Sequence, residues 1–126
     1  MSNVLTESAE NYLETILILS QELTVVRSVD ITNELGFKKS SVSVAMKNLR
    51  EKEHIKVDEQ GFIHLTPSGL EIANMIYERH TLLSSWLIHL GVPADVAAAD
   101  ACKMEHVIST ESFEAIKRHV YENKEV

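Results

Sequence analysis

Three side chains with different ligand chemistry lie one helical turn apart near the end of this 126-residue chain. Cys102, Glu105 and His106 occupy positions i, i+3 and i+4, so a helix places a thiolate, a carboxylate and an imidazole on one face, within reach of a common ion. Thiolate and imidazole suit Fe2+, Co2+, Ni2+ and Zn2+, whereas all-oxygen sites suit Mn2+ or Mg2+. The spacing predicts a divalent-metal site with a preference for iron-like metals.

Two other segments carry residues of the same kinds. Asn11 and Glu14 repeat the i, i+3 spacing and can bring an amide oxygen and a carboxylate to the same ion, and His80 adds an imidazole. Each residue alone has an ordinary explanation, because a helical histidine is commonly a surface residue and a lone cysteine is commonly a small buried hydrophobe. Matching ligands on three segments make a shared metal site the stronger interpretation.

The charge of the chain is unevenly distributed. Its formal net charge is -7, which by itself argues against nucleic acid because basic side chains drive phosphate binding. Between Arg27 and Lys56, however, seven basic and four acidic residues give a net charge of +3. This split indicates a local basic surface and a separate acidic region, as expected for a DNA contact face and a cation site. A chance fluctuation in surface charge is the alternative.

The basic segment has the pattern of a helix-turn-helix. A short helix is predicted after Ser28, which can act as its N-cap, and Gly36 can end it in a left-handed conformation. A second helix follows in KKSSVSVAMKNLREKEHI, capped by Ser40 or Ser41, with apolar residues on its inner face. Two short helices joined by a tight turn form this motif.

The start of the second helix carries the groups that contact DNA in such motifs. Recognition helices present their first residues to base edges, while hydroxyl and basic side chains hold phosphates. The candidate DNA-binding residues are Lys38, Lys39, Ser40, Ser41, Ser43 and Lys47. Serines accept or donate to several bases, so modest direct readout is expected. Winged helices also serve as protein-interaction modules, and the basic tip favours DNA over that alternative.

The remaining elements support this recognition helix. Segment HIKVDEQGFIHLT alternates apolar and polar residues around a turn, which predicts a two-stranded wing. Thr66 and Pro67 form a strong helix start. Helices are expected over Thr6–Glu22, Thr66–Leu90, Ala94–Val107 and Ser109–Asn123. The predicted fold is mostly α with a small β-hairpin, a winged helix-turn-helix followed by a helical domain.

Composition narrows the class of protein. Hydrophobic residues make up 44% and charged residues 25% of the chain, within the globular range. No apolar run approaches the roughly 20 residues that span a membrane, and the N-terminus lacks a secretion signal. A single cysteine excludes an internal disulfide framework. We therefore expect a cytoplasmic protein with no membrane partner. No organic cofactor is expected either.

Five stretches resemble the diphtheria toxin repressor and manganese transport regulator family (DtxR/MntR) of metal-activated, dimeric repressors. They are ENYLETI, KKSSVSVAMKNL, HLTPSG, ERHTLL and, most specifically, ACKMEHVIS. The resemblance covers nearly the whole chain. It implies a winged helix-turn-helix DNA-binding domain over residues 1–72 and a helical metal-binding and dimerisation domain over residues 73–126, in a short form without a C-terminal SH3-like domain.

The resemblance also implies a ligand set. Glu14, His80, Cys102, Glu105 and His106 match family ligand positions, and Cys102 resembles the iron-responsive branch. Asn11 departs from the family pattern, where methionine is usual in the iron branch and aspartate in the manganese branch, although its carbonyl oxygen can ligate. A two-metal site of the manganese-branch kind is the alternative to the one ion per subunit that we expect.

Ser84 and Ala98 replace the glutamate and histidine of the family's ancillary site. That site draws further ligands from a C-terminal domain, and this chain ends at Val126. We therefore expect no ancillary site of that kind.

The function expected from these observations is that of a repressor of metal-homeostasis genes. It would bind a double-stranded operator as a homodimer when Fe2+, or alternatively Mn2+, Co2+, Ni2+ or Zn2+, is bound. The second hypothesis is a winged-helix regulator that senses an organic ligand or thiol oxidation at Cys102. An enzyme with Cys102 as nucleophile and His106 as base is disfavoured, because helical neighbours offer no oxyanion hole.

Overall fold

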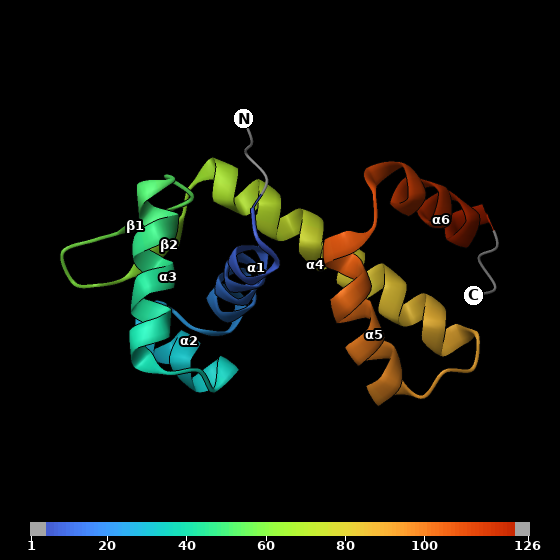
Figure 1. Ribbon diagram of the computed structural model, residues 1–126, viewed down its shortest axis with the longest axis horizontal. Coiled ribbons are helices and arrows are strands. Elements are labelled where there is room, and N and C mark those ends of the chain that lie inside the picture. Colours follow the sequence, from blue (N-terminus) through green and yellow to red (C-terminus); the bar gives the residue numbers. More distant parts are fainter. Residues whose placement is uncertain (1–4, 123–126) are drawn as a thin grey trace. The chain divides into compact units, whose positions relative to one another are not determined.

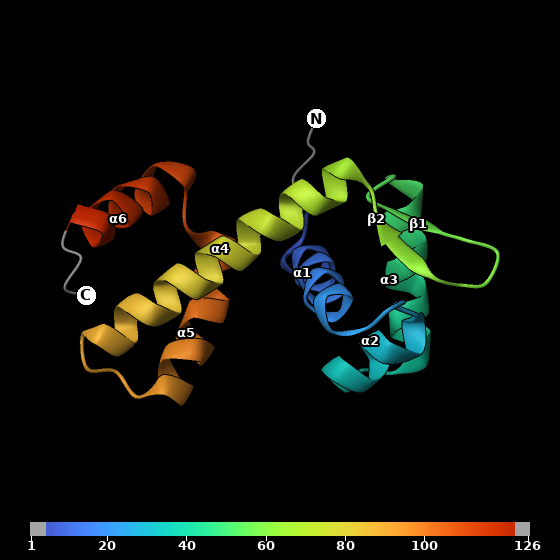
Figure 2. The same ribbon diagram turned by 180° about the vertical axis from the view of Figure 1, so that it is seen from behind.

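The computed structural model describes residues 5–122 and confirms the predicted fold class (Figure 1, Figure 2). Six helices and one two-stranded hairpin make up this range: α1 (Glu7–Glu22), α2 (Ser28–Leu35), α3 (Lys39–Glu51), β1 (Ile55–Val57), β2 (Ile63–Leu65), α4 (Pro67–His89), α5 (Ala94–Val107) and α6 (Thr110–Glu122). The chain divides into two compact units, Met1–Met75 and Ile76–Val126. The boundary between them falls inside α4.

The first unit packs α1, α2, α3 and the hairpin around one apolar core. Every third or fourth residue of α3 faces this core, and Val42, Met46 and Leu49 are all at most 5% exposed. Leu13 and Ile16 of α1 are equally buried. The apolar period of about 3.6 residues therefore predicted these helix faces correctly.

Two predicted helix caps are wrong, by one residue in α2 and by two or three residues in α3. Ser28 is the first residue of α2 rather than its N-cap, because the N–H of Arg27 donates to the Asp30 carboxylate over 2.8 Å and makes Arg27 the cap. Lys38 is the N-cap of α3 in place of Ser40 or Ser41, and its side chain makes no capping hydrogen bond. The predicted end of α2 is confirmed, since Gly36 has a left-handed φ of 70°.

The hairpin forms the predicted wing. Its strands are antiparallel, and the register pairs Ile55 with Leu65 and Val57 with Ile63. The turn is held by Asp58, whose carboxylate accepts hydrogen bonds from the N–H groups of Gln60 and Phe62, both at 2.9 Å. A hydrogen bond from the His64 side chain is the main cause that lowers the pKa of Asp58. The wing is thus fixed by its own turn.

The start of α4 is tied to the corner between α3 and β1. Thr66 caps the helix as predicted, accepting from the N–H of Gly69 at 3.2 Å and donating to the carbonyl of Glu53 at 2.7 Å. A Cβ atom at Gly69 would lie 1.9 Å from the carbonyl oxygen of His54. Glycine is therefore required at this close approach.

The second unit packs α5 and α6 against the later turns of α4. Leu82, Leu83, Ala101 and Phe113 form its buried cluster. The bounds of α5 agree with the prediction, and α6 begins one residue after the predicted Ser109, whose hydroxyl accepts from the N–H of Ser112. The predicted end of α6, Asn123, lies outside the described residues. Within residues 5–122, no helix combines the length and apolarity needed to cross a membrane.

Candidate metal centre and nucleic-acid interface

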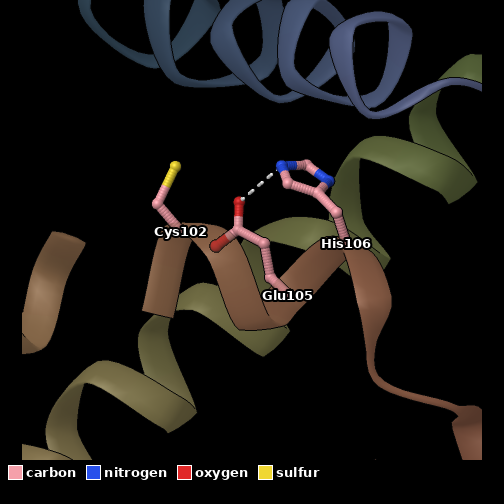
Figure 3. Close-up of side chains that lie close together, drawn as sticks. All are labelled: Cys102, Glu105 and His106. Atoms are coloured by element: carbon pink, nitrogen blue, oxygen red, sulfur yellow. Dashed lines mark ion pairs between the residues drawn. The ribbon is translucent and has the colours of Figure 1, made fainter. Parts of the chain in front are cut away.

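The three predicted ligands of α5 lie together. Cys102, Glu105 and His106 project from the same side of the helix (Figure 3), and one potential ligand atom from each lies within 4.8 Å of the other two. The i, i+3, i+4 spacing produces this arrangement because 3.6 residues complete a helical turn. A soft thiolate, a carboxylate oxygen and an imidazole nitrogen can therefore reach one ion.

The Glu105 carboxylate is the buried centre of this cluster. It is 0% exposed, and Oε1 lies 2.8 Å from Nδ1 of His80 on α4. Its second oxygen, Oε2, lies 3.4 Å from Nε2 of His106. A buried carboxylate is costly without such partners. Two imidazoles therefore approach the carboxylate, one at each oxygen, and His80 contacts the cluster through Glu105.

Arg79 contacts the end of α5 beside the cluster, and it is not among the site residues predicted from the sequence. It is only 7% exposed, and its Nη1 group donates to the carbonyl oxygens of Glu105 and Ile108 over 3.1 and 2.9 Å. A charged residue on an amphipathic helix normally faces water, so its sequence context carries no sign of burial. The contact is visible only from the packing of α4 against the end of α5.

Asn11 and Glu14 lie on α1, one turn apart, as their spacing predicts. Glu14 is buried at 6% exposure and Asn11 is half-buried. They belong to the first compact unit, whereas the α5 cluster and His80 belong to the second. Their participation in a metal site stays a prediction.

The predicted DNA-binding residues line one accessible region of the first unit. Lys38, Lys39, Ser40, Ser41, Ser43 and Lys47 are all exposed. Val44, on the same outer face of α3, is 59% exposed. The first N–H groups of a helix have no partner within the helix, and here lysine side chains flank them. This surface can accept phosphate oxygens and present hydroxyl and methyl groups to bases.

The two units together define a class of protein. The first unit is a winged helix-turn-helix whose third helix, α3, exposes basic and hydroxyl side chains, and the second is a helical unit with a candidate metal centre on α5. Together they are the parts of a DNA-binding protein that responds to a metal ion.

Comparison with known families identifies which proteins of this class the chain resembles. A family model described as the N-terminal DNA binding domain of iron dependent repressors matches residues 4–65. A second, described as the metal binding and dimerisation domain of iron dependent repressors, matches residues 66–125. The chain belongs to the DtxR/MntR family of metal-dependent transcriptional repressors. The α3 surface falls in the first match and the α5 cluster in the second.

Individual relatives agree with this assignment. The chain is 33% identical over 109 residues to the transcriptional regulator MntR of Salmonella typhimurium, covering 86% of this chain and 69% of that protein. It is 30% identical over 115 residues to an HTH-type transcriptional regulator of Methanocaldococcus jannaschii, covering 90% of this chain and 92% of that protein.

Solved structures share the fold. The manganese regulator SloR superposes with a TM-score of 0.80 at 26% identity, over 90% of this chain and 53% of that chain. A manganese-dependent transcriptional repressor in complex with manganese gives a TM-score of 0.79 at 27% identity, over 89% of this chain and 52% of that chain. The chain thus spans about half the length of these two structural relatives.

Proposed function

We propose that this protein is a cytoplasmic, Fe2+-responsive repressor that binds a double-stranded operator as a homodimer and controls genes of metal-ion homeostasis. The observation that carries the proposal is the cluster of Cys102, Glu105 and His106 on α5, with one ligand atom of each within 4.8 Å of the others. Cation binding offsets the charge of the buried Glu105 carboxylate, which otherwise depends on imidazole partners.

The choice of Fe2+ rests on ligand softness. A thiolate at Cys102 beside the imidazole of His106 suits Fe2+, Co2+, Ni2+ or Zn2+ better than Mn2+. Mn2+ is the main competitor, since the Salmonella typhimurium relative is named MntR and SloR is described as a manganese regulator. One ion per subunit is sufficient for the ligands on α5 and His80.

Two residues of α1 complete the proposed ligand set. Glu14 supplies a carboxylate and Asn11 an amide oxygen, both suited to a divalent cation. This part rests on ligand chemistry and on the resemblance of Glu14 to a family ligand. An ion that favours the DNA-competent arrangement acts through its higher affinity for that arrangement, which is the source of any metal-dependent switch.

Operator binding is assigned to the start of α3. The exposed Lys38 and Lys39 provide positive charge for phosphates, while Ser40, Ser41 and Ser43 offer hydroxyl groups to bases. In a homodimer, two copies of α3 can occupy half-sites one or more helical turns apart. The family match to a dimerisation domain over residues 66–125 supports this assembly.

Anaerobic DNA binding tests the proposal directly. A promoter fragment with a palindromic site is titrated with protein in the presence and absence of Fe2+, Mn2+ and Zn2+. Wild type is compared with Cys102→Ala and His106→Ala, and with His89→Ala as an exposed histidine control on α4. We expect binding only with metal, lost in both ligand variants and retained in the control.

Two results would contradict the proposal, one its metal switch and the other its choice of metal. Equal binding with and without metal would remove the metal switch, and loss of that binding on peroxide treatment would point to thiol oxidation at Cys102. Stronger activation by Mn2+ than by Fe2+ would retain the repressor and correct the metal.

A further inference from the structure

Arg79 is a buried cation that contacts the end of α5, next to two of the candidate ligands, and supplies no metal-ligating atom itself. Its side chain extends from α4 to the end of α5, where Nη1 donates to the carbonyl oxygens of Glu105 at 3.1 Å and Ile108 at 2.9 Å. Nη2 lies 3.5 Å from the Thr110 hydroxyl, at the start of α6. The guanidinium also lies over the ring of Phe113, 5.4 Å from its centroid.

The end of α5 needs such a donor. The last four carbonyl groups of an α-helix lack partners within the helix, and a buried carbonyl without one costs free energy. A cation is also favoured near the negative end of a helix dipole. Arg79 meets both needs, because the planar guanidinium presents several N–H donors in a fixed geometry. Figures 1 and 2 both show the α5–α6 connection beside the middle of α4.

Glu105 is held at two points by consecutive residues of α4. Arg79 donates to its backbone carbonyl, and His80 forms a hydrogen bond of 2.8 Å with its carboxylate. Neighbouring residues on a helix point about 100° apart, which allows one to reach the backbone and the other the side chain. Helix α4 therefore holds both the backbone and the side chain of Glu105.

We infer that Arg79 is a positioning residue of the metal centre, which holds the end of α5 so that Glu105 and His106 meet the ion in a prearranged geometry. This inference rests on the proposed metal-binding function. Replacing a residue that orients metal ligands without binding the metal itself typically lowers metal affinity by roughly 10- to 100-fold. Arg79 acts through a backbone carbonyl rather than through the ligand side chain.

Anaerobic Co2+ titration followed by absorption tests the inference in the full chain. Arg79→Met removes all donors at similar length, and Arg79→Lys keeps the charge but lacks the planar set of donors. Phe113→Leu is the matched control, because it weakens packing of the same guanidinium and leaves its carbonyl contacts in place. The free energy of unfolding of each variant is measured by urea denaturation without metal.

We expect the Co2+ dissociation constant to rise by about 10- to 100-fold in Arg79→Met and by a smaller factor in Arg79→Lys, with an altered Co2+ absorption spectrum in both. Phe113→Leu should lower stability but change the dissociation constant by less than about threefold and leave the spectrum unchanged, because the backbone contacts of Arg79 that set ligand geometry remain. This difference separates positioning of ligands from general support of the fold.

Two results would overturn the inference. One is that Arg79→Lys binds Co2+ with wild-type affinity and a wild-type spectrum. This result would overturn the inference even if Arg79→Met fails to fold. The other is an equal loss of Co2+ affinity in Phe113→Leu and Arg79→Met at equal loss of stability. A wild-type protein that takes up no Co2+, Fe2+ or Mn2+ would instead overturn the proposed function, and the inference with it.

Discussion

Nδ1 of His80 lies 2.8 Å from Oε1 of Glu105, so the imidazole of one proposed ligand holds the carboxylate of another. The two residues come from different helices of the second unit, α4 and α5. An ion that binds both atoms must replace this hydrogen bond with two coordinate bonds. Metal binding and the packing of α5 on α4 therefore involve the same pair of side chains.

Glu105→Gln tests the charge of this carboxylate. The amide has the same shape and can still form a hydrogen bond with His80, so the helical content should be retained. Loss of the anionic ligand should weaken Fe2+ or Mn2+ binding by more than roughly 10- to 100-fold, the range typical when a residue that only hydrogen-bonds to a ligand is replaced. Isothermal titration under anaerobic conditions measures the dissociation constant. Unchanged affinity would exclude Glu105 as a ligand.

Cys102→Asp tests the metal preference. The substitution replaces a soft thiolate with a hard oxygen ligand and keeps an anionic group at the same position. Because softness of the donor selects among divalent ions, the ratio of Fe2+ to Mn2+ affinity should fall by about tenfold or more. Competition titrations give this ratio, with Lys103→Ala as an exposed neighbouring control. An unchanged ratio would mean that the thiolate does not set the preference.

Lys39→Ala tests the assignment of the phosphate contacts. Removal of one phosphate contact per subunit should weaken binding to all DNA sequences and reduce the slope of log affinity against log salt by about 2 per dimer. Fluorescence anisotropy at several salt concentrations, with saturating metal, measures the slope. Arg118→Ala, an exposed cation of α6, serves as the control. Equal effects of the two substitutions would argue against a specific role of α3.

Gly69→Ala tests the close approach at the start of α4. At an ordinary exposed helical position, alanine would stabilise the fold by about 1 kcal/mol relative to glycine. Here the added Cβ would lie 1.9 Å from the His54 carbonyl oxygen, so we expect a loss of about 1–3 kcal/mol instead. Urea denaturation measures it, with Asn74→Ala as an exposed control on the same helix. A stabilised variant would show that the contact relaxes freely.

The helices and the α5 cluster could be predicted from sequence because both depend on local spacing. The apolar period that places Val42, Met46 and Leu49 in the core is a property of one segment. The shared face of Cys102 and His106 likewise follows from helical geometry alone. Helix starts are less predictable from the sequence. Ser28 is a good capping residue in isolation, but the Asp30 carboxylate accepts a hydrogen bond from the N–H of Arg27, and Arg27 is the cap.

Contacts between distant segments could not be predicted in the same way. Arg79 reaches carbonyl and hydroxyl groups that lie 26 to 31 residues further along the chain. Nothing in its sequence neighbours distinguishes it from a solvated arginine, because its two closest partners are backbone carbonyls, which every residue type supplies. The hydrogen bond between His80 and Glu105 depends on the packing of α4 on α5, although the residue types of both identify them as candidate ligands.

The boundary between the two compact units falls between Met75 and Ile76, within the continuous helix α4. Proteases commonly cut chains at exposed loops, and they act on extended rather than helical backbone. Cleavage between these units therefore requires local unwinding of α4. The rate at which a protease separates the two halves becomes a measure of how often this helix opens, and a ligand that stabilises the helix would lengthen the lifetime of the intact chain.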